Sequence, residues 1–492
     1  MEKRKEKKDS RLAKNYLYNL AYHIFTIITP LITTPYISRA LGSENIGIYG
    51  YVESICAYFI VMGNMGFPLY GQREIAYYAD DTKKRSQRFV EIMIGKTLFL
   101  LISIVLYIGY VAIFAKDNKI IFYSYTLGMV ADVIHIGWYY QGIEEFRITV
   151  ARNFFIKIAT VISIFIFVKT ENDLLKYSIL INAANLLGNA LIIFGLKNTL
   201  DLKDIRIRIS EVFKHVKPAF ILAIPYYITK IYAVLDKTIL GSISGNYSEV
   251  GYYEQSQKIV VFALSIVTSL GVVFLPRIAN EVANNNRDAI KSYLNRGIEA
   301  IMLLSFPILA GLLLIGDMMV PWFFGDGYEK VGSLIKIFSP LALIMGLSNL
   351  VGNQFLIASK REKHLTLSIA SGVVINVILN FILVYKYQSI GVAIATVISE
   401  FCKLILVFIF VNQEIDFSVF AKNIISYLVS AGIMFAAGLF SRNIWFSDFT
   451  FTNTLFIILI CAFVYLSCLF MTKNNLLLSI LNRLIKSKFQ KQ

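Results

Sequence analysis

Residues 225–277 decide the fold: they read PYYITKIYAVLDKTILG, then SISGNYSEV, then GYYEQSQKIVVFALSIVTSLGVVFLPR. Two long apolar runs flank a short polar loop. Each run can cross a bilayer, because about 20 helical residues span about 30 Å of hydrocarbon. Near the bilayer centre an ionisable side chain costs about 2.5–3.5 kcal/mol and usually faces a water-filled cavity or a polar substrate. This hairpin carries five: Lys230, Asp236, Lys237, Glu254 and Lys258.

The composition extends this interpretation to the whole chain. Of its 492 residues, 57% are hydrophobic and 16% are charged, whereas soluble domains have about 25% charged residues. No Gly-rich phosphate loop and no metal-ligand spacing occurs, so we expect no cofactor. We expect an all-α polytopic membrane protein with fourteen transmembrane helices, at 15–37, 46–67, 89–114, 120–140, 148–168, 174–196, 218–240, 250–274, 297–315, 332–357, 364–384, 389–411, 419–440 and 452–472.

Lysine and arginine are distributed unevenly between the loops. With both termini and alternate loops on one side, that side carries 33 Lys and Arg residues, the other side carries 7, and 8 lie inside spans. Positive charge marks cytoplasmic loops, so we expect a multi-pass protein of the bacterial plasma membrane with both termini in the cytoplasm. The same rule explains the net charge of +16 without a nucleic-acid partner.

A short motif recurs about 200 residues along the chain. It reads LGSENIGIY at 41–49, and then LG at 240–241 followed by SEVGYY at 248–253. Six spans per half predict a parallel repeat around a central cavity. The predicted parts are a cytoplasmic basic arm (1–14), an N-terminal six-helix half (15–197), a cytoplasmic linker (198–217), a C-terminal six-helix half (218–411), two extra helices (412–472) and a cytoplasmic basic amphipathic tail (473–492).

Several segments, in their order and spacing, resemble the polysaccharide-transporter branch of the multidrug/oligosaccharidyl-lipid/polysaccharide (MOP) flippases, the Wzx-type family. They include TPYISRALGSENIGIY (34–49), GFPLYGQREIA (66–76), DVIHIGWYYQGIEEFRITVARN (132–153) and SIGVAIATVISE (389–400). The resemblance covers the first twelve spans. It implies a flippase, not an enzyme, that moves polyprenyl-pyrophosphate-linked oligosaccharide units from the inner to the outer leaflet for capsule, exopolysaccharide or O-antigen assembly. It also implies membrane lipid, a polysaccharide polymerase and glycosyltransferases of the same pathway as partners.

Other functions share this architecture or this membrane setting. A lipid II flippase has the same architecture, and a drug/cation antiporter has the superfamily fold, so both remain alternatives. A membrane glycosyltransferase would need catalytic carboxylates in a sizeable loop, and the longest external loop is only around 317–331. Alternating access is expected to be driven by the membrane potential or by a cation, because each negative charge moving outward gains about 2.3 kcal/mol per 100 mV.

A lipid-linked sugar needs a polar, cationic groove, since its hydroxyls and pyrophosphate cannot cross hydrocarbon unaided. Lysine and arginine bind pyrophosphate through charge-assisted bonds. The candidates for this contact are Arg39, Lys230, Lys237 and Lys258. The cavity carboxylates that could bind H⁺ or Na⁺ as a coupling ion are Glu53, Asp132, Asp236 and Glu254. The candidates for sugar contact are Trp138, Tyr139 and Gln141.

Each set of candidates also has a structural interpretation. Asp236 and Lys237 could lie at the outer interface, and Glu254 could form an intrahelical pair with Lys258. Glu53 and Asp132 could bond between helices, and the Trp138–Gln141 segment could be an interfacial anchor. Four further lysines are expected to reach the membrane surface through their long side-chain stems. They are Lys96, Lys176, Lys336 and Lys403, and Lys403 is also expected to form a salt bridge with Glu400.

Overall fold

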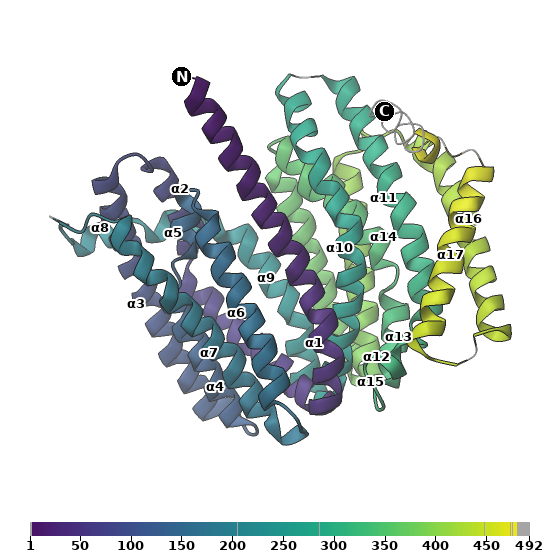
Figure 1. Cartoon of the computed structure of the whole chain (residues 1–492), viewed down its shortest axis with the longest axis horizontal. Helices are drawn as coiled ribbons and strands as arrows, with labels where there is room; N and C mark the ends of the chain where they lie inside the picture. Colours follow the sequence, from purple (N-terminus) through teal and green to yellow (C-terminus); the bar gives the residue numbers. More distant parts are fainter. Residues whose placement is uncertain are drawn as a thin grey trace. The chain divides into compact units, whose positions relative to one another are not determined.

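The computed structural model describes residues 2–203, 205–284, 286–446, 448–472, 474 and 476–479, leaving out the side chains of 2–24, 27, 198, 272–273 and 417–423. Helices and their connections make up this described part (Figure 1). Most of the predicted amphipathic tail, residues 480–492, lies outside the described residues. The helices are α1 (Glu2–Asn64), α2 (Phe67–Tyr77), α3 (Thr82–Phe114), α4 (Lys119–Val133), α5 (Gly137–Gly142), α6 (Phe146–Phe167), η1 (Glu171–Asp173), α7 (Leu174–Ile193), η2 (Phe194–Asn198), α8 (Ile209–Lys214), α9 (Val216–Ser244), α10 (Tyr247–Ala283), α11 (Arg287–Ile315), α12 (Met319–Phe323), α13 (Glu329–Phe338), α14 (Leu341–Ser348), η3 (Asn349–Leu356), α15 (Glu362–Phe410), α16 (Phe417–Ile444) and α17 (Phe451–Met471).

Within the described residues, eleven helices are long and apolar enough to cross a membrane, or twelve if the bent pair Glu329–Phe338 and Leu341–Leu356 forms one span. The prediction of an all-α polytopic membrane protein is therefore confirmed. The count is below fourteen because α1 and α15 each run across two predicted spans. Non-helical backbone interrupts α1 at Gly42 (φ 74°) and α15 at Gln388 (φ 48°).

The chain folds into two compact units. The first unit contains Met1–Gly241 and Asn246–Gly251, and the second contains Ser242–Gly245 and Tyr252–Gln492. Packing thus assigns residues 218–241 to the first unit. The linker predicted at 198–217 is a boundary between the two halves of the sequence repeat, not between packed units, and it stays a prediction.

In the first unit, α4 packs against α3 and α7, while α6 packs against α7 and α1. A cluster of buried aromatic side chains joins α2, α3 and α5. In this cluster the ring of Phe89 stacks on Trp138 with centroids 5.5 Å apart. Of these helices, α1, α4, α6 and α7 also supply residues that line the cavity described below.

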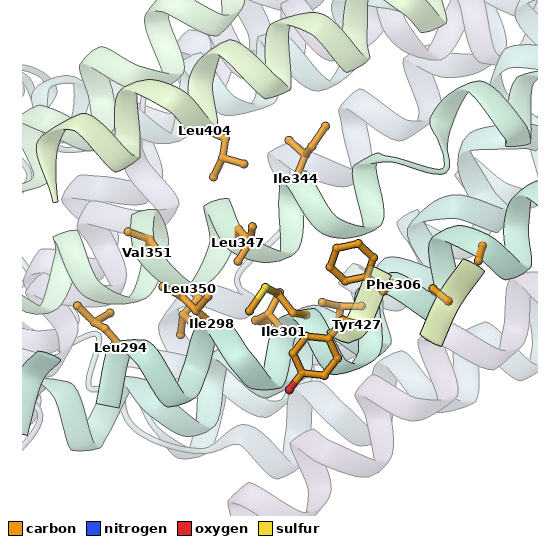
Figure 2. Close-up of a cluster of buried hydrophobic side chains, with 14 of the residues drawn as sticks. Leu294, Ile298, Ile301, Phe306, Ile344, Leu347, Leu350, Val351, Leu404 and Tyr427 are labelled. Carbon is orange, nitrogen blue, oxygen red and sulfur yellow. The ribbon is translucent and has the colours of Figure 1, made fainter. Parts of the chain in front are cut away.

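The second unit is built around α11. Figure 2 shows Ile298 and Ile301 of α11 beside Leu347 of α14 in the apolar core. The ring of Tyr427 from α16 stacks on Phe306 with centroids 6.4 Å apart. α16 and α17 pack on each other and on α11, so the two helices predicted within 412–472 belong to the core of this unit.

Two glycines from the two copies of the repeated motif meet inside the first unit. A Cβ built on Gly47 would lie 1.6 Å from the carbonyl oxygen of Tyr247 and 2.9 Å from the backbone nitrogen of Gly251. A Cβ built on Gly251 would lie 2.1 Å from the carbonyl oxygen of Ser43. The contact is reciprocal, because Ser43 and Tyr247 each precede their glycine by four residues. Backbones approach this closely only where no side chain separates them.

Candidate functional site

The first unit encloses a polar cavity of about 780 Å³, lined by residues of α1, α4, α6, α7 and α9. Three of the predicted site residues line it: Glu53, Asp132 and Lys230. The lining adds polar residues that were not among the predicted site residues, namely His135, Arg152, Asn153, Lys157, Thr160, Asn182, Asn185 and Asn189. We call this the polar cavity.

The cations of the polar cavity come mainly from α6. Arg152 and Lys157 both line it, and the intervening Ile156 shares the face of Arg152 at a spacing of four residues. Lys230 reaches the cavity from α9, where its ammonium lies 5.5 Å from the ring centroid of Tyr226. Three cations thus converge on one cavity, in a setting where hydrocarbon alone would disfavour them.

Three asparagines of α7 also line the polar cavity. Asn182, Asn185 and Asn189 lie three and four residues apart and therefore share one helix face. Asn189 accepts a hydrogen bond from the Arg152 guanidinium and donates one to the carbonyl oxygen of Ala131 at 2.7 Å. This spacing was readable in the sequence, but a search confined to ionisable and aromatic residues misses it.

Glu53 is held by a partner from α9. The ammonium of Lys237 lies 2.8 Å from the Glu53 carboxylate, and the Lys237 side chain is only 10% exposed. One residue further on, the hydroxyl of Thr238 donates to the Ser54 hydroxyl at 2.9 Å. Lys237 itself does not line the polar cavity; its ammonium contacts the cavity residue Glu53.

Asp132 lies where α4 ends, and the buried Lys96 of α3 supports this end. The Lys96 ammonium donates to the carbonyl oxygens of Asp132 at 2.6 Å and His135 at 2.7 Å. Its side chain is fully buried. The interpretation of Lys96 as a stem reaching the membrane surface is therefore wrong, because backbone carbonyls at the end of α4 offer its ammonium acceptors inside the unit.

The aromatic candidates for sugar contact lie in the interior. Trp138 and Tyr139 are at most 2% exposed and belong to the aromatic cluster of α2, α3 and α5. The Trp138 indole donates to the carbonyl oxygen of His135 at 3.2 Å, and the Tyr139 hydroxyl donates to that of Thr199 at 3.0 Å. Only Gln141 is exposed. These packed rings are outside the lining of the polar cavity.

The remaining candidates are placed elsewhere. Arg39 is exposed on α1, and Asp236 is buried on α9 outside the polar cavity. In the second unit, the ammonium of Lys258 lies 2.9 Å from the Glu254 carboxylate, which confirms the intrahelical pair. Lys403 likewise pairs with Glu400, as predicted; Lys176 pairs with Asp173, and Lys336 with Asp317.

Metal ions are not indicated by the side chains. Among the described residues, no group of three or more His, Cys, Asp or Glu side chains could hold a metal ion. The polar cavity instead combines cations with carboxamides. Such groups suit an anion that also carries hydroxyls, because a carboxamide both donates and accepts hydrogen bonds.

Two curated proteins are similar in sequence. A protein of Escherichia coli (strain K12) named “Putative O-antigen transporter” is 24% identical over 405 residues, which cover 82% of this chain and 97% of that protein. Lipid II flippase MurJ of Bacillus subtilis (strain 168) is 26% identical over 183 residues, which cover 36% of this chain and 34% of MurJ.

Solved structures share the fold at low sequence identity. One is the inward closed conformation of lipid II flippase MurJ, with a TM-score of 0.70 at 17% identity, covering 94% of this chain and 99% of that one. Another is the inward-facing conformation of a multidrug resistance MATE family transporter of the MOP superfamily, with a TM-score of 0.60 at 12% identity, covering 79% and 97%. Identities this low establish the fold alone.

A family model settles the membership. The model described as polysaccharide biosynthesis protein matches residues 12–282, which is more than half of the chain. The predicted family resemblance is thereby confirmed, as is the expectation that the chain is not an enzyme. The chain belongs to the polysaccharide biosynthesis protein family.

Proposed function

We propose that this protein flips polyprenyl-pyrophosphate-linked oligosaccharide units across the bacterial cytoplasmic membrane for capsule, exopolysaccharide or O-antigen assembly. The polar cavity of the first unit is the proposed binding site for the pyrophosphate and its sugars. The family and the full-length similarity to the Escherichia coli protein support this substrate class. Glycosyltransferases that build the unit and a polymerase that consumes it would then be its partners in the pathway.

The observation that carries the proposal is the charge of the polar cavity. Arg152, Lys157 and Lys230 line it together with two carboxylates. One of these, Glu53, already has Lys237 at 2.8 Å. With Lys237 counted, four cations stand against two carboxylates, and this net positive charge suits a pyrophosphate, which arginine and lysine bind by charge-assisted hydrogen bonds. The asparagines of α7 add donors and acceptors for sugar hydroxyls.

The proposed architecture has fourteen spans. Counted along the chain at 1.5 Å per residue, the 49 residues of α15 amount to about 73 Å of helix, more than twice the hydrocarbon thickness. Two spans in each of α1 and α15, with the bent pair Glu329–Phe338 and Leu341–Leu356 as one further span, would restore the predicted count, with both termini in the cytoplasm. Two six-helix halves would then work by alternating access. The reciprocal contact of Gly47 and Gly251 supports such a repeat.

We also propose Glu53 and Asp132 as the groups that bind a coupling ion, H⁺ or Na⁺. Both carboxylates line the polar cavity, and a carboxylate within a membrane is a common site for proton or ion coupling. Their lysine contacts differ. Lys237 bonds to the Glu53 carboxylate itself, whereas Lys96 bonds to the backbone carbonyl at Asp132.

The test is substrate translocation in proteoliposomes by wild type, Arg152→Gln and the control Arg147→Gln. Arg147 lies on the same helix but is exposed and outside the polar cavity. Losing one hydrogen bond to a charged group costs about 1.5–3 kcal/mol, so Arg152→Gln should slow transport of a polyprenyl-pyrophosphate oligosaccharide about ten- to hundredfold. Arg147→Gln should transport at the wild-type rate.

Other outcomes decide between the alternatives. Translocation of lipid II alone would move the protein to the lipid II flippase class. The sequence similarity to MurJ is the reason to test that alternative. Translocation of neither lipid, together with cation-driven dye export, would leave the drug/cation antiporter. Equal rates for Arg152→Gln and wild type would remove the polar cavity from the mechanism.

A further inference from the structure

A second cavity in the first unit is almost wholly apolar. It has a volume of about 440 Å³ and is lined by residues of α1, α3 and α9 together with Met65, which follows α1. Among its thirteen lining residues only Ser103 and Tyr227 carry a hydroxyl. The Ser103 hydroxyl already donates to the carbonyl oxygen of Phe59 at 2.5 Å. We call this cavity the apolar groove, since it offers a ligand little besides hydrocarbon.

The apolar groove and the polar cavity share a wall. Val61 of α1 lines both of them. On α9, Lys230 and Val234 face the polar cavity, whereas Ile228 and Ile231 face the apolar groove. The two cavities therefore lie on opposite sides of the α1–α9 pair, with opposite chemistry.

Two close contacts flank the segment of α9 that lines both cavities. At one end a Cβ on Gly241 would lie 2.3 Å from the Tyr51 ring, and at the other end a Cβ on Gly66 would lie 2.2 Å from the carbonyl oxygen of Ala219. Between Ala219 and Gly241, α9 advances about 33 Å at 1.5 Å per residue. This segment contains Pro225, which removes a helical hydrogen bond and favours bending.

We propose that this segment of α9, together with the facing residues of α1, frames a portal for the hydrocarbon tail of the substrate. The polyprenyl chain passes between α1 and α9 beside Val61 and lies in the apolar groove, while its pyrophosphate stays in the polar cavity. This inference rests on the proposed function. A lipid-linked sugar joins a polar head directly to a long apolar chain, and two adjoining cavities of opposite chemistry match that connection.

The first test is Val61→Trp, which fills the shared wall. Val105→Trp is the matched control, because Val105 is 69% exposed on α3 and outside the apolar groove. Translocation of long-chain polyprenyl pyrophosphoryl N-acetylglucosamine is measured in proteoliposomes. Displacing even two methylene groups of the chain corresponds to about a tenfold loss, so Val61→Trp should be slower by at least that factor and Val105→Trp should match wild type.

A second measurement guards against misfolding of Val61→Trp. The photoreactive residue p-benzoylphenylalanine replaces Met62, which is 61% exposed in the apolar groove, or Val105 as the control. Both variants are irradiated in phospholipid vesicles with a trace of the radiolabelled lipid-linked sugar. We expect label on the position-62 variant well above that on the position-105 variant.

The outcomes separate this inference from the proposed function. Equal labelling at the two positions means that bulk phospholipid fills the apolar groove, and it overturns the portal. Normal transport by Val61→Trp also overturns it while leaving the flippase function intact. Absence of transport by wild type, by contrast, removes the proposed function itself.

Discussion

Replacing Gly47 with alanine tests whether the two copies of the repeated motif must touch. The new Cβ would lie 1.6 Å from the carbonyl oxygen of Tyr247 and 2.5 Å from its carbonyl carbon. An ordinary C···O contact needs about 3.3 Å, so the two backbones would have to move apart by almost 2 Å. No flexible side chain is available to give way, since both clashing atoms belong to the backbone.

The magnitude follows from two opposing terms. Overpacking of this kind costs about 1–3 kcal/mol, whereas glycine to alanine in a helix gains up to about 1 kcal/mol. We expect a net loss of about 1–2 kcal/mol, a factor of about 5–30 in the folded-to-unfolded ratio. The control is Gly109→Ala on α3, where nothing lies within 4 Å of the new Cβ.

The assay is thermal unfolding of the purified protein in detergent, read from the loss of monodisperse elution. Gly47→Ala should lower the apparent Tm, and Gly109→Ala should keep or raise it. Gly251→Ala should resemble Gly47→Ala because the contact is reciprocal. The double variant should lose less than the sum of the two, since both changes open one contact. Wild-type stability of Gly47→Ala would refute the reasoning.

Three further predictions concern the charges of the first unit. Lys96→Met should cost about 1.5–3 kcal/mol of stability because two carbonyl acceptors at the end of α4 lose a charged donor, while the exposed Lys176→Met should cost far less; thermal unfolding compares them. A double-mutant cycle of Glu53→Gln and Lys237→Met should give a coupling of about 1 kcal/mol, since the carboxylate is 45% exposed and solvent screens the pair; zero coupling would mean that the ion pair contributes nothing. Outward flipping of a pyrophosphate-linked lipid should accelerate with an inside-negative potential, because each charge gains about 2.3 kcal/mol per 100 mV; an unchanged rate under imposed potentials would exclude uncompensated charge movement.

Hydropathy and the repeated motif predicted much of the fold because the bilayer constrains both. Apolar runs of fixed length mark the spans, and the motif copies at Gly47 and Gly251 meet in the structure. The site was predicted only in part. Glu53 and Lys237 are 184 residues apart in sequence, so their pairing depends on tertiary packing that no local spacing encodes. Trp138 looked interfacial beside a charged turn, but its neighbours in space are the apolar residues of α2 and α3.

The second unit treats its intramembrane polar groups differently, and this contrast bears on where substrate choice resides. There Asn380 donates to Asn376 at 3.0 Å, and Lys403 pairs with Glu400. The cavity beside Lys403 has a volume of only about 90 Å³, too small for a sugar unit. Both pairs lie within α15, where buried polar groups serve as partners for one another, whereas polar side chains that line a large cavity can also contact a ligand. Changes on the cavity faces of α6 and α7 should therefore alter which glycan is carried, and changes at Asn376 should alter stability instead.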